Sequence, residues 1–148
     1  MKTRLFLLLF LLTTITASTQ TSGVGVGLIL GEPTGISVKN WLSAKYSING
    51  AAAWSFAETG AIHLHADYVF HNFELLNPDV GELAFYYGLG GRIKLAEKSR
   101  LGLRVPLGLN YVLEDNPLDL FLEVVPMLDL VPETYFTVNA AIGIRYFF

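Results

Sequence analysis

The feature that most constrains this chain is an alternation of apolar with small or polar residues that begins near Ser22. Apolar side chains occupy Val24, Val26, Leu28 and Leu30, and glycines stand between the first of them. The same period of two returns over residues 101–111, 118–124 and 140–148. Successive side chains of a strand point to opposite faces, so this period predicts β-strands and does not fit helices.

Clusters of turn-forming residues interrupt the alternation at even intervals. They contain Gly, Pro, Asn, Asp or short charged runs, and they fall at residues 31–34, 43–45, 58–60, 77–79, 97–99, 114–117 and 131–133. Gly, Pro, Asn and Asp favour turns for conformational reasons. The breaks predict strands over 22–30, 34–43, 46–56, 60–74, 82–95, 100–113, 118–130 and 134–148. Most of these segments reach the roughly 9–11 residues that a tilted strand needs to cross a bilayer.

The two faces of the predicted strands differ in side-chain size and polarity. One face carries Leu, Val, Ile and aromatic residues with hardly a charge, whereas the other carries Gly, Ala, Ser, Asn and a few charges. Small polar residues suit the narrow interior of an eight-stranded barrel, and lipid outside explains the apolar face. The sequence therefore predicts an all-β chain, an eight-stranded antiparallel up-and-down transmembrane β-barrel over residues 22–148. A soluble lipocalin-like barrel is the alternative fold.

Aromatic residues support the transmembrane interpretation if both ends of the barrel chain lie in the periplasm. One predicted girdle then forms at the periplasmic end and a second at the opposite end, as membrane interfaces favour. The first contains Tyr46, Tyr68, Phe70, Phe85, Tyr87, Tyr111, Tyr146 and Phe148, and the second Trp54, Phe56 and Phe136.

The first 17 residues are typical of a secretory signal peptide. Lys2 and Arg4 precede an apolar run from Leu5 to Leu12, and small residues allow cleavage after Ala17. The stretch from Leu5 to Ala17 is too short to serve comfortably as a membrane anchor. The net charge of −3 gives no support for binding nucleic acid, and the absence of cysteine excludes disulfides and cysteine-based metal sites.

The last predicted strand alternates up to an aromatic residue. Ala140, Ile142, Ile144, Tyr146 and Phe148 share one face. A strand that ends in this way resembles the segment by which the outer-membrane assembly machinery recognises its barrel substrates. We expect Tyr146 and Phe148 to act as that assembly signal.

Several segments resemble a family of small bacterial outer-membrane barrels of largely unknown function, related in architecture to the transmembrane domain of OmpA. They are GLILGEPTG at 27–35, LHADY at 64–68, YYGLGGR at 86–92, RVPLGLNY at 104–111, PLDLFLE at 117–123 and AIGIRY at 141–146. The resemblance covers nearly all of residues 22–148 and implies a single barrel domain in the outer membrane of a Gram-negative cell. It implies no activity and no active-site residues.

Charged side chains collect on the face predicted to line the lumen. They are Lys39, His63, His65, Asp67, Arg92, Lys94, Arg104, Asp119, Glu123, Asp129 and Arg145. Buried charges need partners, so we expect an ion-pair network that fills the barrel. Glu123 is the expected hub, with Arg104 and Arg145 as its candidate partners. A conducting polar pore is the alternative.

His63, His65 and Asp67 are spaced two residues apart and so share a face of one strand. Two imidazoles and a carboxylate can bind a metal ion, but luminal histidines paired with acids are the favoured interpretation. No nucleophile stands beside a base in a recognisable motif, so no catalysis, metal or cofactor is expected.

The sequence thus predicts an integral outer-membrane barrel with a structural or envelope-maintenance role. We expect it to be a monomer whose partners are outer-membrane lipids and, during biogenesis, the assembly machinery. A narrow channel for small solutes and a lipid-modifying enzyme are the alternatives. The loops predicted on the outer side, 31–34, 57–60, 96–99 and 131–134, are too short to offer a large binding surface.

Overall fold

The computed structural model describes residues 22–56 and 60–148. In these residues the chain forms nine antiparallel strand segments. They are β1 (Val24–Gly31), β2 (Thr34–Trp41), β3 (Tyr46–Trp54), β4 (Ile62–Asn72), β5 (Glu82–Leu95), β6 (Arg100–Arg104), β7 (Leu107–Val112), β8 (Leu118–Val131) and β9 (Tyr135–Phe147). The predicted signal peptide, 1–17, lies outside the described residues, as does most of the predicted turn at 58–60. Among the described residues no helix is long and apolar enough to cross a membrane.

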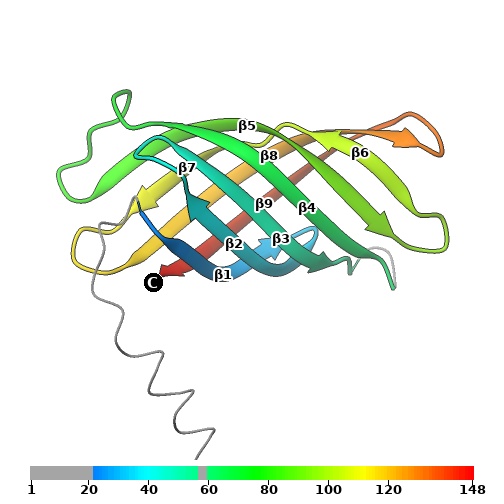
Figure 1. Ribbon diagram of the computed structural model, residues 1–148, viewed down its shortest axis with the longest axis horizontal. Coiled ribbons are helices and arrows are strands. Elements are labelled where there is room, and N and C mark those ends of the chain that lie inside the picture. The colour runs from blue at the N-terminus through cyan, green and yellow to red at the C-terminus, as the bar shows by residue number, and fades with distance from the viewer. Residues whose placement is uncertain (1–21, 57–59) are drawn as a thin grey trace, which may run out of the picture.

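The strands close into a ring (Figure 1). Neighbouring strands pair along the chain, except that β6 and β7 both lie between β5 and β8, and β9 pairs with β1 from Gly25↔Phe147 to Gly31↔Ala141. The backbone N–H of Phe148 extends the seam by donating to the carbonyl of Val24 at 2.9 Å. Closure leaves no free sheet edge among the described strands, which removes the unpaired backbone groups that an open sheet would expose.

β6 and β7 are two halves of one strand. Both pair with β5 and with β8, and the register Gly90↔Arg104 continues without a shift as Tyr87↔Leu107. The ladder is interrupted at Pro106, which has no N–H to donate. The carbonyl of Pro106 still accepts from Gly88 at 3.0 Å. The predicted eight-stranded up-and-down barrel is therefore confirmed, with the strand predicted over 100–113 divided at this proline.

The interior and exterior of the barrel follow the alternation in the sequence. Outward-facing side chains are aliphatic and exposed, such as Leu28 at 55% and Ile142 at 56%. Inward-facing side chains include a small apolar cluster of Ile29, Val69, Tyr86 and Phe121. Most other large side chains of the interior are polar or charged, so the barrel is inverted relative to a soluble protein.

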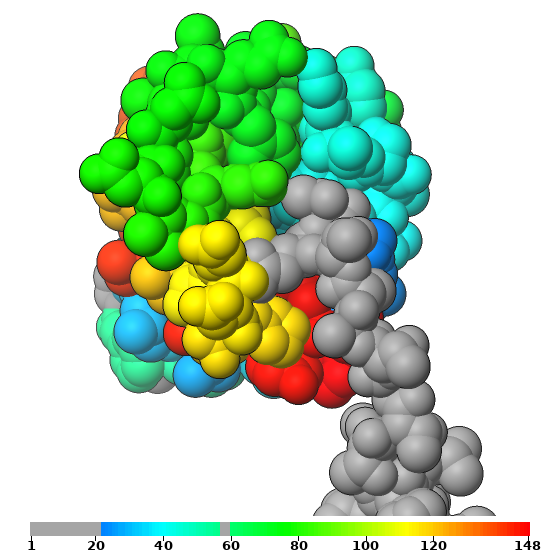
Figure 2. All heavy atoms as spheres, turned by 90° about the vertical axis from the view of Figure 1, so that its left-hand side faces the viewer, coloured from blue at the N-terminus to red at the C-terminus, as the bar shows by residue number. Residues whose placement is uncertain are grey.

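The two ends of the barrel differ in their connections (Figure 1). The end that holds residue 22 and residue 148, here the terminal end, carries the connections 42–45, 73–81 and 113–117. The opposite end, here the distal end, carries the connections 32–33, 96–99 and 132–134, together with residues 55–56 and 60–61 of the β3–β4 connection. Figure 2 looks onto the terminal end, where the β4–β5 connection (green) and the β7–β8 turn (yellow) cover much of the barrel.

Candidate functional site: charged clusters in the lumen

Charged side chains line the interior at every level of the barrel. Those that are buried are Lys39, His63, Asp67, His71, Arg92, Arg104, Asp119, Glu123, Asp129 and Arg145. Each lies on the inward face because it shares strand parity with the small residues of that face. All of them except His63 belong to three clusters, which follow one another from the terminal to the distal end.

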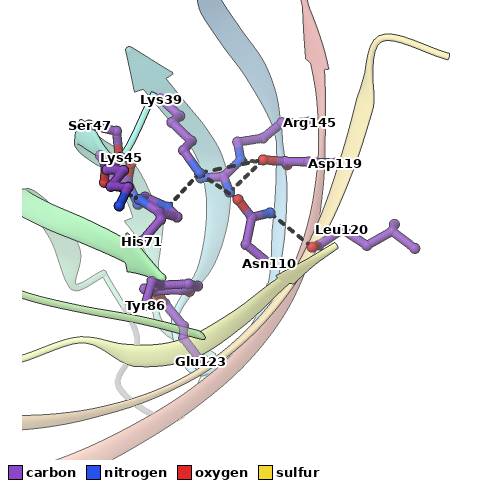
Figure 3. Close-up of polar contacts among 11 residues, drawn as sticks. Lys39, Lys45, Ser47, His71, Tyr86, Asn110, Asp119, Leu120, Glu123 and Arg145 are labelled. Carbon is purple, nitrogen blue, oxygen red and sulfur yellow. Dashed lines mark hydrogen bonds and ion pairs between the residues drawn. The ribbon is translucent and has the colours of Figure 1, made fainter. Parts of the chain in front are cut away.

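The lysine cluster lies near the terminal end and contains Lys39, His71, Asn110, Asp119 and Arg145 (Figure 3). The ammonium of Lys39 donates to the side-chain oxygen of Asn110 at 2.6 Å and lies 2.8 Å from Nε2 of His71. It is also 3.7 Å from a carboxylate oxygen of Asp119. Residues from β4, β7 and β8 therefore meet at the fully buried ammonium group that β2 supplies.

The carboxylate of Asp119 also holds Arg145. Nε and Nη2 of Arg145 donate to its two oxygens at 2.8 and 3.0 Å, which is the planar fork geometry that guanidinium groups favour. The guanidinium also lies over the ring of Phe121, 4.1 Å from its centroid. One carboxylate thus faces two buried cations, and Asn110 supplies the second oxygen ligand of Lys39.

His71 links the lysine cluster to the barrel rim. Its Nδ1 lies 3.3 Å from the backbone carbonyl of Lys45, while Nε2 faces Lys39. A neutral imidazole protonated at Nδ1 satisfies both contacts, because Nδ1–H donates to the carbonyl and Nε2 accepts from the ammonium.

The tyrosine cluster lies in the middle of the barrel and contains Tyr86, Glu123, Arg104, Asp67 and His65. The hydroxyl of Tyr86 donates to Oε2 of Glu123 at 2.9 Å, and Oε1 is 3.5 Å from Nη2 of Arg104. Nε of Arg104 lies 2.8 Å from Oδ1 of Asp67. The two groups are not aligned for a hydrogen bond, so the contact is an ion pair. Asp67 in turn lies 3.3 Å from Nδ1 of His65.

The arginine cluster lies near the distal end and contains Arg92, Asp129 and Arg100. Nε and Nη2 of Arg92 donate to the carboxylate of Asp129 at 2.8 and 2.6 Å. Arg100 makes one longer contact with the same carboxylate, at 3.5 Å, and lies over the ring of Tyr135 at 5.1 Å.

Aromatic side chains fill the space beside inward-facing glycines. Phe121 lies opposite Gly143 in the β8–β9 register, and a Cβ on that glycine would stand 2.2 Å from the ring. Phe147 covers Gly25 in the same way, because a Cβ there would stand 2.6 Å from its ring. Tyr86 likewise covers Gly108. These glycines make room for rings within a lumen that eight strands leave narrow.

Comparison with solved structures identifies the fold. The chain matches the crystal structure of the N-terminal β-barrel domain of Pseudomonas aeruginosa OprF with a TM-score of 0.64 and 14% sequence identity. The match covers 86% of this chain and 98% of that one. The chain has an OmpA-type barrel fold. No protein-family profile and no curated protein sequence matches the chain.

In this OmpA-type barrel one of the two expected arginine partners of Glu123 is confirmed and the other is wrong. Glu123 contacts Arg104, but Arg145 pairs with Asp119 instead. The reason is register: Asp119 lies directly opposite Arg145 on the neighbouring strand, whereas Glu123 lies opposite Ala141. Glu123 takes its second partner, Tyr86, from β5, which β7 separates from β8 at this level.

The three residues considered for metal binding do not form a group. His65 contacts Asp67, and His63 is buried nearer the distal end, opposite Ala53 and Lys94 in the register. In the described part of the chain no set of three His, Cys, Asp or Glu side chains could hold a metal ion. Lys94 is half-buried on the inward face.

Four residues of the clusters were missed by the sequence analysis: His71, Tyr86, Arg100 and Asn110. Their place in the alternation was a usable signal. His71 lies on the same strand face as His63 and Asp67, and Tyr86 lies on the same face as Arg92. Tyr86 and Asn110 carry no charge, so the search for charged residues passed over them. His71 lies too far along β4 to join His63, but its partner, Lys39, comes from β2.

Proposed function

We infer that this protein is an integral outer-membrane β-barrel whose lumen is closed by its own side chains and whose role is structural. The observation that carries this proposal is the inversion of polarity: the outer wall is aliphatic while the charges lie inside. An aliphatic wall of this extent is stable only against lipid, because a soluble barrel places its apolar residues in the interior.

Aromatic contacts at the two ends support a membrane setting. At the terminal end Tyr46 stacks on Tyr68 with 5.5 Å between ring centroids, and Phe70 contacts Tyr87 at 5.4 Å. At the distal end Trp54 contacts Phe56 at 6.4 Å. Aromatic rings at both ends of an aliphatic wall match the two interfaces of a bilayer.

The three luminal clusters support a closed barrel rather than a channel. Lys39, Asp119 and Arg145 are almost completely buried, and rings fill the spaces beside the glycines. We place the terminal end in the periplasm, so that the short distal connections face outward. These offer little area to a surface partner, since a specific interface buries about 800 Å² on each side.

Lipids of the outer membrane are the proposed partners of the wall, and the protein is proposed to act as a monomer. Tyr146 and Phe148 are proposed as contacts for the assembly machinery during biogenesis. The rings of this pair lie 5.2 Å apart at the terminal end of β9, and both side chains face outward. No catalytic role is proposed.

The decisive experiment compares a charge placed on the wall with the same charge placed in a turn. Leu122 is 52% exposed on the outward face of β8, and arginine there is expected to cost about 2–4 kcal/mol of insertion energy. Leu122→Arg should therefore reduce recovery of folded barrel in the outer-membrane fraction, measured by heat-modifiable gel mobility. Glu114→Arg, in the exposed β7–β8 turn, is the matched control and should insert normally.

A soluble barrel would behave differently in the same experiment. The wild-type protein would be recovered in the periplasmic fraction, and Leu122→Arg would be tolerated on a water-exposed face. Either result would contradict the proposed membrane location.

A further inference from the structure

The distal rim carries a cleft that borders the arginine cluster and shares Arg100 with it. It lies between the β5–β6 and β8–β9 connections, has a volume of about 470 Å³, and is lined by Lys98, Ser99, Arg100, Pro132, Glu133 and Tyr135. Lys98 is exposed, and the side chain of Arg100 is 34% exposed.

The charges around this cleft favour an anion. Arg92 already holds both oxygens of Asp129, so Arg100 has only its single 3.5 Å contact with that carboxylate. Lys98 adds a second accessible cation, and Glu133 is the one carboxylate in the cleft lining. Two cations and one carboxylate thus line the cleft, which gives its lining a net positive charge. Glu97 lies in the same connection but is not part of the lining, and the hydroxyl of Ser99 donates to the carbonyl of Ala96 at 3.4 Å.

A separate apolar groove runs down the outer wall beside the same β5–β6 turn. It has a volume of about 450 Å³, and its lining includes Leu64, Ala66, Gly91, Ile93 and Leu101. Ala66 and Gly91 lie opposite each other in the register and form a shallow floor between larger side chains. A Cβ on Gly91 would meet nothing nearer than 3.8 Å, so the groove is open at this point.

The cleft and the groove are both lined by residues of the β5–β6 hairpin. Lys98, Ser99 and Arg100 line the cleft, and Leu101, the next residue, lines the groove. Along β5 the lining of the groove extends from Gly91 to Ile93, about 7 Å at the usual rise, which is room for part of an acyl chain.

We propose that this side of the distal end binds a lipid with an anionic phosphate, holding the headgroup in the cleft and part of one acyl chain in the groove. The guanidinium of Arg100 and the ammonium of Lys98 donate to phosphate oxygens, as these groups commonly do. The acyl chain lies over Gly91 and contacts Leu64, Ile93 and Leu101. The inference rests on the membrane location proposed above.

The test uses the folded barrel in nanodiscs of phosphatidylglycerol and phosphatidylcholine in equal parts, with retained lipids identified by native mass spectrometry. The wild-type protein should retain phosphatidylglycerol in preference to phosphatidylcholine. The double variant Lys98→Ala/Arg100→Gln should lower that preference about tenfold, since basic groups near a membrane surface attract anionic lipids. Lys45→Ala removes an exposed lysine at the terminal end and should leave the preference unchanged.

The groove is tested independently of the charges. Gly91→Leu fills the floor of the groove and should reduce lipid retention, whereas Gly91→Ala adds a single methyl group and should reduce it less. Gel mobility of each variant verifies that it is folded before the lipids are counted.

The outcomes separate this inference from the proposed function. A barrel that enters nanodiscs but shows no preference for phosphatidylglycerol, or loses it equally in Lys45→Ala, overturns the lipid site alone. If millimolar inorganic phosphate displaces the lipid and Gly91→Leu has no effect, the cleft binds free anions and the lipid assignment is wrong. Failure of the wild-type protein to fold into nanodiscs overturns the membrane location as well.

Discussion

Asp119 is the one carboxylate of the lysine cluster, and it faces two buried cations. Its side chain is completely buried, its two oxygens bind Arg145, and Lys39 lies 3.7 Å away. Lys39 has further support from Asn110 and His71, but Arg145 has no second carboxylate among its described contacts. Loss of Asp119 would therefore leave Lys39 with Asn110 and His71 alone, and Arg145 without its main partner.

We expect Asp119→Ala to lower the free energy of unfolding by about 3–5 kcal/mol, the usual cost of removing one partner of a buried pair. Urea unfolding of the barrel in lipid vesicles, followed by tryptophan fluorescence, measures this change. Glu74→Ala is the control, because its contact with Lys45 is exposed, at 80% and 54%, and such pairs contribute about 0–1 kcal/mol.

A double variant tests whether the charges of Asp119 and Arg145 stabilise the barrel as a pair. Asp119→Ala/Arg145→Met removes both charges, so it should recover part of the lost stability. If the double variant is as unstable as the sum of the two single variants, the charges are not coupled and the interpretation of the cluster is wrong.

Among the elements, the seam between β1 and β9 decides whether the barrel closes. Its strands come from opposite ends of the barrel sequence and approach closely where β1 has glycine. A Cβ on Gly27 would stand 1.7 Å from the backbone carbonyl oxygen of Ile144, and backbone cannot move aside as a flexible side chain can. The seam therefore requires glycine at this position for steric reasons.

We expect Gly27→Ala to force β1 and β9 apart locally and to destabilise the barrel by at least about 1–3 kcal/mol, as overpacking does. Hydrogen exchange should accelerate at amides of Val24–Gly31 and Tyr135–Phe147, with little change in β3 and β4. Gly91→Ala is the matched control, since its new methyl group meets open space. Equal exchange in both variants would show that the seam does not limit closure.

For the molecule as a whole, the three clusters and the aromatic rings beside the glycines fill the lumen, so no wide pore crosses the barrel. We expect the wild-type barrel in planar bilayers to give no stable conductance. Arg104→Ala/Glu123→Ala removes two long side chains from the middle of the lumen and should produce measurable ion current. A stable wild-type conductance that Glu123→Ala does not alter would contradict the closed lumen and favour the narrow-channel alternative.

The sequence by itself determined the strands and their faces. A period of two is local information: once Leu28 faces outward, Gly27 must face inward, and the same rule places Lys39 and Arg145 inside. Turn residues divided the strands, and the ends moved by only a few residues in the structure. Pro106 is also evident in the sequence. It divides the strand into β6 and β7 because it has no N–H to donate to the neighbouring strand.

The tertiary structure alone decided which inward-facing side chains meet. Arg145 binds Asp119 because the β8–β9 register sets them opposite each other, and a shift of two residues would keep every face while changing the partner. His71 reaches Lys39 across the intervening strand, and Tyr86 reaches Glu123 from β5, because the ring curves these strands toward one another. Alternation specifies a face, whereas register and closure of the ring specify a neighbour.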